Sequence, residues 1–131
     1  MAEKKVLVVD DEIHIVHVVA IKLRNNGYEV ISAENGADAF ELTCSENPDI
    51  IVADVQMPVM NGLELVEKIR KCESTKDIPV ILLTARTFAI EDEQKQKLQI
   101  SLCLSKPFSP RELLKDIEDI LYQRAVIDRE V

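Results

Sequence analysis

Short apolar runs alternate along this chain with longer stretches in which apolar residues recur every three or four positions. Short apolar runs bounded by turn signals are typical of buried strands in a parallel sheet. We predict such strands at Lys5–Val9, Glu29–Ala33, Asp49–Ala53, Ile78–Leu83 and Ile100–Leu104. The stretches between them and after the last one have the periodicity of amphipathic helices.

The first two helices are predicted from their apolar faces and stop signals. The helix over residues 11–25 ends at Asn25-Asn26-Gly27, a common helix terminator. Its predicted buried face is Ile13, Val16, Ala20 and Leu23. The helix over residues 37–45, followed by Pro48, has the predicted face Ala37, Phe40 and Cys44.

Three more helices follow, at residues 62–71, at roughly 88–98, and from Pro110 onward. The fourth has a thin apolar face and many charges. The fifth has the strongest start signal in the chain, with Ser109 as the N-cap, Pro110 in the first turn and Glu112 as the capping-box partner. Leu114, Ile117 and Leu121 then supply its buried stripe.

Strands that alternate with helices predict an α/β domain with a parallel sheet. We assign residues 1–122 to one such domain, which is large enough to bury a core without disulfides or metals. Residues 123–131 carry mixed charge and are interpreted as an extension of the last helix, a tail or the start of a linker.

Composition narrows the function classes. The formal net charge of −8 argues against a nucleic-acid surface and against an anionic membrane face. The chain passes from MAEKK directly into VLVVDDE, so no signal peptide is predicted, and no apolar run approaches the length of a membrane span. Three cysteines without short metal spacing predict reduced thiols, buried or half-buried, in a cytoplasmic protein.

Polar residues stand where the predicted strands end. Asp10 and Asp11 follow the first strand, Asp54 follows the third, Thr84 the fourth and Lys106 the fifth. The carboxyl ends of parallel strands meet at one edge of an α/β sheet, where ligands bind. We therefore expect three carboxylates, a hydroxyl and an ammonium to converge, although one of the first two aspartates would equally serve to cap the first helix.

This set of groups suits phosphoryl transfer. Neighbouring carboxylates repel one another and attract a cation, and an all-oxygen cluster with room for water suits Mg²⁺. Asp54 would be a nucleophile that forms an aspartyl phosphate. Lys106 would neutralise charge on the phosphoryl oxygens, and Thr84 would donate a hydrogen bond to the bound phosphate.

Four motifs in order, VVDDE, DVQMPVMNG, LLTA and LSKPF, resemble the receiver domain of two-component response regulators over nearly the whole chain, about Lys4 to Tyr122. The resemblance implies a flavodoxin-like, doubly wound (βα)5 fold whose five-stranded parallel sheet has the order 2-1-3-4-5. It also implies a phosphoprotein that acts in phosphorelay signal transduction.

The resemblance implies a metal site. Asp11 would be a direct ligand of Mg²⁺, Asp10 would act largely through water, and Asp54 and the backbone carbonyl of Gln56 would complete the site. The same oxygen set would also accept Mn²⁺.

The resemblance implies the remaining roles as well. Asp54 would be the phosphoacceptor, Lys106 would bind the phosphate, and Thr84 would move toward it as part of a switch. Gln56 and Arg86 would tune the lifetime of the phosphoryl group. The Lys106–Pro107 bond would be cis, which an X-Pro bond permits at about 0.5–1 kcal/mol.

The chain departs from the family at two places. Cys103 stands at the switch position that is usually Tyr or Phe, and a thiol does not fill the volume of an aromatic ring. Gln99-Ile100 stands where a Gly-Ala pair is common, so the fourth helix is expected to end differently.

We expect a sensor histidine kinase or a histidine phosphotransfer protein as the phosphoryl donor. The output would be a protein partner bound to the face of the fourth helix, fifth strand and fifth helix, with no direct nucleic-acid or membrane contact and with a monomer or weak homodimer as the free state. The protein would catalyse only its own phosphorylation and dephosphorylation, and would not be an enzyme in any wider sense.

Two other functions with a similar architecture are disfavoured by particular residues of this chain. A haloacid-dehalogenase-type phosphatase needs an Asp where Gln56 stands, and a flavodoxin-like FMN carrier needs a phosphate loop where Asp10-Asp11-Glu12 would repel one. Two alternatives stay open: a phosphorylation-independent pseudo-receiver that acts as an interaction module, and a receiver that is a fragment of a longer regulator.

Overall fold

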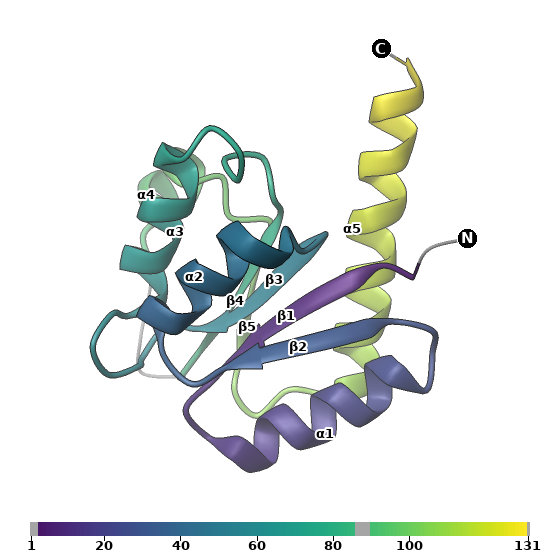
Figure 1. Ribbon diagram of the computed structural model, residues 1–131, viewed down its shortest axis with the longest axis horizontal. Helices are drawn as coiled ribbons and strands as arrows, with labels where there is room; N and C mark the ends of the chain where they lie inside the picture. The colour runs from purple at the N-terminus through teal and green to yellow at the C-terminus, as the bar shows by residue number, and fades with distance from the viewer. Residues whose placement is uncertain (1–2, 86–89, 131) are drawn as a thin grey trace.

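The computed structural model describes residues 3–85 and 90–130. Within these ranges five strands form a parallel sheet in the order β2-β1-β3-β4-β5, which confirms the predicted fold and strand order (Figure 1). The strands are β1 (Lys5–Val9), β2 (Glu29–Ala33), β3 (Ile50–Asp54), β4 (Val80–Thr84) and β5 (Leu102–Ser105). The bounds of β1 and β2 are those predicted, and the other strands end one residue later than predicted.

The helices are α1 (Ile13–Arg24), α2 (Gly36–Glu46), α3 (Gly62–Lys71), α4 (Asp92–Lys97) and α5 (Pro110–Glu130). The predicted helices agree with these to within two residues, except the fourth. That prediction began at Phe88, and residues 86–89 lie outside the described part of the chain. The described helix begins only at Asp92, after Glu91 at its N-cap.

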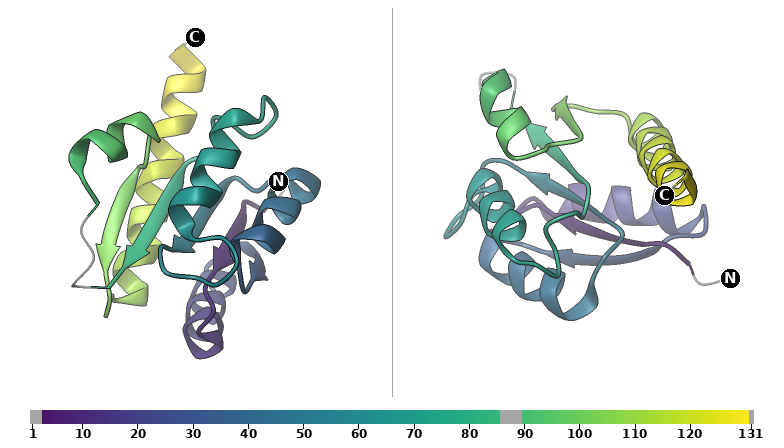
Figure 2. Two further views of the ribbon diagram at one scale, coloured as in Figure 1. Left: turned by 90° about the vertical axis from the view of Figure 1, so that its left-hand side faces the viewer. Right: turned by 90° about the horizontal axis from the view of Figure 1, so that it is seen from above.

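Side chains of each strand alternate between two cores, one on each face of the sheet. Leu7 and Val9 of β1 point toward α2 and α3, and Val6 and Val8 point toward α1 and α5. Figure 2 shows these helix pairs on opposite sides of the strands. Burial on both faces explains why the strands are apolar throughout rather than alternating with polar residues.

Two predicted helix faces are corrected by the structure. On α1 the buried residues are Val16, Val19, Ala20 and Leu23, whereas Ile13 is 58% exposed. On α2 the buried residues are Gly36, Ala39 and Thr43, and Cys44 is exposed. The prediction that all three thiols are buried or half-buried is therefore wrong for Cys44.

Side chains cap α2, α3 and α5 at the carboxyl edge of the sheet, whereas the N-caps of α1 and α4, Glu12 and Glu91, make no side-chain capping hydrogen bond. The Asn35 side chain accepts a hydrogen bond from the Asp38 amide at 2.9 Å and so caps α2. On α3, Asn61 and Glu64 form a full capping box that the sequence analysis did not predict. The predicted N-cap Ser109 accepts a hydrogen bond from the Glu112 amide at 3.3 Å.

Helix α4 contributes no buried residue of its own and is held at its C-terminal end. The guanidinium of Arg70, on α3, donates hydrogen bonds to four carbonyls, among them those of Leu98 at 2.8 Å and Gln99 at 3.2 Å. Gln99 has a left-handed φ of 54°, at the position where the family commonly has glycine. The N-terminal end of α4 is held differently, by Ile90, which lies just before the N-cap and is buried in the core on the α2 and α3 face.

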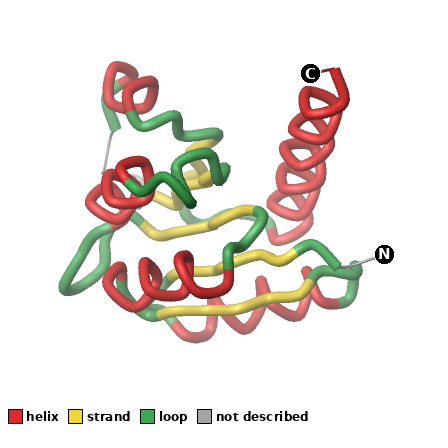
Figure 3. The backbone as a smooth tube through the Cα atoms, turned by 45° about the horizontal axis from the view of Figure 1, so that its top comes forward, coloured by secondary structure: helices red, strands yellow, loops and turns green. Residues whose placement is uncertain are grey.

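Helix α5 extends beyond the ends of the strands. Its 21 residues span about 30 Å, while the strands are only four or five residues long. Figure 3 shows its last turns beyond the ends of the strands. Within the described ranges, none of the helices combines the length and apolar character required to cross a bilayer.

Candidate functional site

Two buried carboxylates lie side by side at the carboxyl edge of the sheet. Asp10 follows β1 directly and Asp54 is the last residue of β3, and these two strands are neighbours in register. Asp10 is fully buried and Asp54 is 5% exposed. Each is oriented by a backbone amide two residues further on: Glu12 N donates to Asp10 at 2.9 Å, and Gln56 N donates to Asp54 at 3.2 Å.

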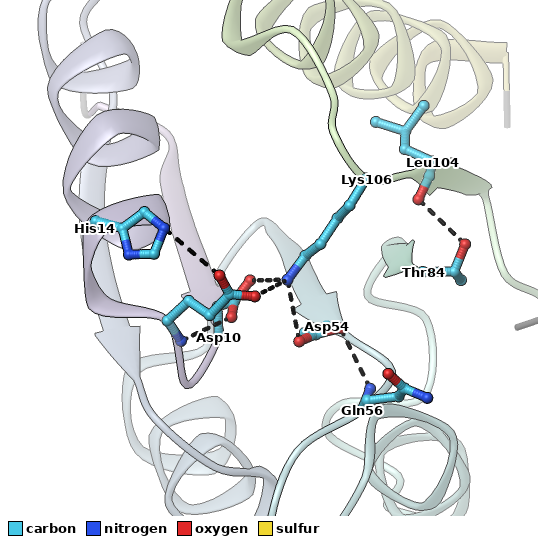
Figure 4. A network of polar contacts seen from close by, with 8 residues as sticks. Asp10, His14, Asp54, Gln56, Thr84, Leu104 and Lys106 are labelled. Carbon is cyan, nitrogen blue, oxygen red and sulfur yellow. Dashed lines mark hydrogen bonds and ion pairs between the residues drawn. The ribbon is translucent and has the colours of Figure 1, made fainter. Parts of the chain in front are cut away.

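Lys106, which follows the edge strand β5, supplies the positive charge that pairs with these carboxylates. Its Nζ lies 2.9 Å from Asp10 Oδ2 and 3.2 Å from Asp54 Oδ2 (Figure 4). The residue follows β5, and its backbone amide donates to the Thr84 carbonyl at 2.7 Å. The Lys106–Pro107 bond is cis, as the family resemblance implied.

Glu12 is a member of the cluster that the sequence analysis missed. Its Oε1 lies 3.2 Å from Lys106 Nζ, and its Oε2 lies 3.5 Å from His14 Nε2. The signal available in the sequence was the third acidic residue in Asp10-Asp11-Glu12. Nothing in that run indicates which two of the three side chains meet the lysine.

Asp11, the predicted direct metal ligand, lies apart from the ion pairs. It is exposed, and it lines a hollow beside the loop after β3 together with Val55, Gln56 and Asn61. The structure thus brings Asp11 next to Gln56, the residue whose carbonyl was predicted to share the metal. The roles assigned to both residues stay predictions.

Thr84 and Cys103 occupy neighbouring strands behind the carboxylates. Thr84 is 6% exposed, and its hydroxyl donates to the Leu104 carbonyl at 3.5 Å, so it points toward β5 and away from Asp54 (Figure 4). Cys103 is half-buried against the core on the α2 and α3 face. Arg86, the second predicted tuning residue, lies outside the described residues.

Burial and charge act against each other in this cluster. Burial, followed by the nearby charge of Asp10, raises the pKa of Asp54, and Lys106 only partly offsets these effects. Burial alone would lower the pKa of Lys106, but the carboxylates of Asp10 and Asp54 outweigh it and raise the pKa. The Lys106 ammonium is therefore charged at any physiological pH. The ionised form of Asp54, in contrast, is less favourable in the folded protein than in water.

The cluster fits a hard divalent cation. Oxygens of Asp10, Glu12 and Asp54 lie within 4.8 Å of one another. Asp10 Oδ2 is buried and, among the described residues, has the ion-pair contact with Lys106 but no hydrogen bond. An under-coordinated buried carboxylate oxygen in an all-oxygen set is what Mg²⁺ binding through one or two carboxylates and water requires.

Glycine allows the backbone to close tightly around Asp54. A Cβ on Gly62 would lie 2.5 Å from the Asp54 carbonyl oxygen, and a Cβ on Gly36 would collide with the Met60 backbone. The first residues of α2 and α3 therefore sit directly against the acceptor strand and its loop. A larger residue at Gly62 would displace the Asp54 backbone, and one at Gly36 would displace Met60 in the loop after β3.

Val59, in the loop after Asp54, adopts an unfavourable backbone conformation. Its φ is 69°, and Met60 N donates to Pro58 O at 2.7 Å across it, which closes a three-residue turn. The left-handed region is strained for a β-branched residue. Val59 is also 84% exposed, so its side chain recovers little energy by packing.

An open cavity of about 500 Å³ adjoins the cluster. Glu12 and Lys106 line it, and the rest of its lining is mainly apolar, with Ile15, Val18 and Phe108. The ion-paired groups are therefore reachable from solvent along the side where α1 faces the start of α5.

Residues 6–118 match the response regulator receiver domain family. The chain belongs to this family. Two solved structures show the likeness in three dimensions. The chemotaxis response regulator CheY4 of Vibrio cholerae is 35% identical, with a TM-score of 0.83 over 91% of this chain and 99% of that one. The Francisella response regulator 1452 receiver domain is 34% identical, with a TM-score of 0.82 over 94% and 99%.

Two curated relatives are longer proteins. The phosphate regulon transcriptional regulatory protein PhoB of Pseudomonas aeruginosa is 37% identical over 99% of this chain and 57% of its own length. The alkaline phosphatase synthesis transcriptional regulatory protein PhoP of Bacillus subtilis is 36% identical over 90% and 48%. The receiver chain thus spans about half the length of these relatives. Its place in a two-component system is that of a receiver, a signalling module.

Replacing Asp54 with Asn is expected to raise the free energy of unfolding at neutral pH. Because the folded state raises the pKa of this carboxyl above its ordinary value of 3.8, folding favours the protonated form and disfavours the ionised one. The gain should shrink as the pH falls and vanish below about pH 4, where both states are protonated. Urea unfolding of D54N and wild type at neutral and acidic pH measures this difference in the free energy of unfolding. Asp119→Asn, on the exposed side of α5, is the control, and a D54N protein less stable than wild type at neutral pH would contradict the prediction.

Replacing Val59 with Gly is expected to stabilise the receiver by about 1 kcal/mol, because relief of the left-handed strain exceeds the added chain entropy of glycine. Val59→Ala, which is no longer β-branched but keeps a Cβ, should gain less. The free energy of unfolding in urea gives both values. A loss of stability in V59G, as expected for glycine in an unstrained loop, would show that Val59 stores no strain.

Proposed function

We propose that this receiver accepts a phosphoryl group on Asp54 from a phosphohistidine donor, with Mg²⁺ as cofactor, and signals by changing the surface formed by α4, β5 and α5. One observation carries the proposal. Asp54 is a buried carboxylate at a strand end, in ion-pair contact with Lys106 and beside the second buried carboxylate, Asp10. Membership of the receiver family supports it.

The transfer is a displacement at phosphorus. An oxygen of the Asp54 carboxylate bonds to the phosphorus, and the bond from phosphorus to the donor's imidazole nitrogen breaks. The nitrogen keeps the electron pair and takes a proton from solvent, so the products are an aspartyl phosphate and a neutral histidine. Asp54 is suited to this because one oxygen is fixed by the Gln56 amide and the other contacts the lysine.

Lys106 and the metal site would share the neutralisation of charge. The Lys106 ammonium, which lies 3.2 Å from Asp54 Oδ2, would form an ion pair with the phosphoryl oxygens once they are attached. Asp10, Asp11, Asp54 and the Gln56 carbonyl would hold Mg²⁺, or Mn²⁺ in its place. When bound, the metal would supply positive charge to the phosphoryl oxygens. Glu12, which contacts the same ammonium, would release it as the phosphoryl group arrives.

A histidine kinase or a histidine phosphotransfer protein is the proposed donor. Its imidazole would approach over the open cavity beside Glu12 and Lys106, whose apolar wall suits a flat ring on a protein surface. Beyond this transfer and the later hydrolysis of its own phosphate, tuned by Gln56 and Arg86, we propose no enzymatic activity.

Output is proposed through α4, β5 and α5. The Thr84 hydroxyl now bonds the Leu104 carbonyl, so a turn toward a phosphate on Asp54 would release β5 on that side. Helix α4 buries no residue between Asp92 and Lys97, so a shift of the helix itself costs little packing energy while Ile90 and Leu98 stay in the core on either side of it. Cys103, on β5, packs against the core on the α2 and α3 face and would replace the usual aromatic switch.

Incubation with acetyl phosphate and Mg²⁺ is expected to add one phosphoryl mass to the intact chain. D54N should gain nothing because it lacks the nucleophile, and EDTA should abolish the gain in wild type because the charge on the cluster is then uncompensated. Asp119→Asn should behave as wild type. Intact-mass spectrometry reads all four samples.

Phosphoramidate, a small phosphorus–nitrogen donor, extends the test to a mimic of phosphohistidine. If neither donor adds a phosphoryl group to Asp54, the phosphoacceptor proposal fails. The protein would then be assigned to the alternative, an interaction module with an intact but idle acidic pocket.

Phosphorylation is expected to shift the backbone amide resonances of α4, β5 and the start of α5 more than those of α2, because only the former follow the movement of Thr84. Two-dimensional amide spectra before and after addition of acetyl phosphate and Mg²⁺ measure the shifts, with D54N as the control. Unchanged resonances over 92–105 in a phosphorylated sample would reject the proposed output face.

A further inference from the structure

Two free cysteines lie outside the candidate site, on neighbouring helices. Cys44 is in the last turn of α2 and is exposed, and Cys72 is the C-cap of α3 and is half-buried. They are 28 positions apart in the chain, and no motif joins them. Their positions in the fold nevertheless bring them together.

The packing of α2 against α3 pairs the two thiols. Both helices cross over between parallel strands on the same face of the sheet, so they run in the same direction (Figure 1). Lys68 Nζ of α3 lies 5.0 Å from the centre of the Phe40 ring of α2. Cys44 and Cys72 each come four residues later, one turn further along the same helix face. The packing that sets Lys68 against Phe40 therefore places the two cysteines next to each other, and each thiol shifts the pKa of the other.

The two thiols are chemically unequal. Cys72 Sγ lies 3.4 Å from the Ser74 hydroxyl, and hydrogen bonding from Ser74, then from Thr75, lowers the pKa of the Cys72 thiol. Burial, followed by the neighbouring Cys72, raises the pKa of Cys44. Since the thiolate is the reactive form, Cys72 is the nucleophile of the pair and Cys44 is the thiol that resolves.

We propose that Cys44 and Cys72 form a reversible disulfide between α2 and α3 when the protein meets a small-molecule disulfide such as oxidised glutathione. The Cys72 thiolate attacks one glutathione sulfur, and the other glutathione leaves as a thiolate. Cys44 then loses its proton, and its sulfur attacks Cys72 and expels the second glutathione thiolate. The two cysteines lose two electrons and two protons, and one oxidised glutathione becomes two reduced ones.

This modification site is separate from the acceptor site. Cys44 and Cys72 lie at the C-terminal ends of their helices, which reach the edge of the sheet opposite to Asp54. The disulfide would join α2 to α3 at that edge, within one molecule. The proposal does not rest on phosphorylation of Asp54.

The test uses the full chain with oxidised glutathione, after which remaining thiols are alkylated and the protein is measured by intact mass and peptide mapping. The expected wild-type product has lost two thiol hydrogens, carries one alkyl group, on Cys103, and yields a peptide that links Cys44 to Cys72. Treatment with dithiothreitol should restore three alkylatable thiols.

Single substitutions make the test specific. C44S and C72S should each stop at a glutathione adduct, formed several-fold faster in C44S, which keeps Cys72. C103S should still form the internal disulfide, and because Cys103 lies on β5 rather than at the ends of α2 and α3 it serves as the matched control. The proposal is overturned if the wild type stops at an adduct, if the bond joins two chains, or if it includes Cys103.

Discussion

The contact of one ammonium with two buried carboxylates governs the carboxyl edge of this molecule. Asp10 and Asp54 end adjacent strands, and their charges repel at close range. Lys106 reaches them from the end of β5, two strands away from β3 in the sheet. A buried charge left without its partner costs several kcal/mol, so these strand ends must stay aligned for the fold to be stable. The same alignment places the groups for the proposed phosphoryl transfer next to one another.

Tight backbone packing holds that edge in place. Gly36 and Gly62 let α2 and α3 begin in contact with the loop and strand that carry Asp54. Asn35 and Asn61 then cap those helices with their side chains. The tight packing around the acceptor contrasts with α4, which carries no buried residue and is held by Arg70 and by the flanking core residues Ile90 and Leu98. The domain thus combines a fixed reaction centre with one loosely held surface helix.

Much of this arrangement follows from the order of residues in the chain. The apolar runs of β1 and β2 are bounded by charged residues, so their limits were predicted correctly. The limit of β3 was placed one residue early, because Asp54 is polar although its backbone still pairs with Leu83. The polar residues after the strands were sufficient to predict that Asp10, Asp54 and Lys106 converge, since parallel topology fixes where strand ends lie.

Other features depend on contacts that no local pattern contains. The predicted α2 face was Ala37, Phe40 and Cys44, of which Phe40 packs against the core. The buried residues are the smaller Gly36, Ala39 and Thr43, which permit closer packing, and the Thr43 hydroxyl donates a hydrogen bond to the Ala39 carbonyl. Glu12 meets a lysine 94 positions away, so its place in the cluster required the fold. The pairing of Cys44 with Cys72 is of the same kind.

The charge balance at the acceptor edge also determines which solutes enter it. Three carboxylates share one ammonium, so a surplus of negative charge, and with it a negative potential, lies beside the open cavity that Glu12 and Lys106 help to line. Free phosphate and nucleotides are anions, and this potential lowers their concentration in the cavity without any steric barrier. The acidic cluster is therefore an electrostatic filter. Anions from bulk solution, acetyl phosphate among them, are disfavoured there unless a positive charge such as Mg²⁺ accompanies them.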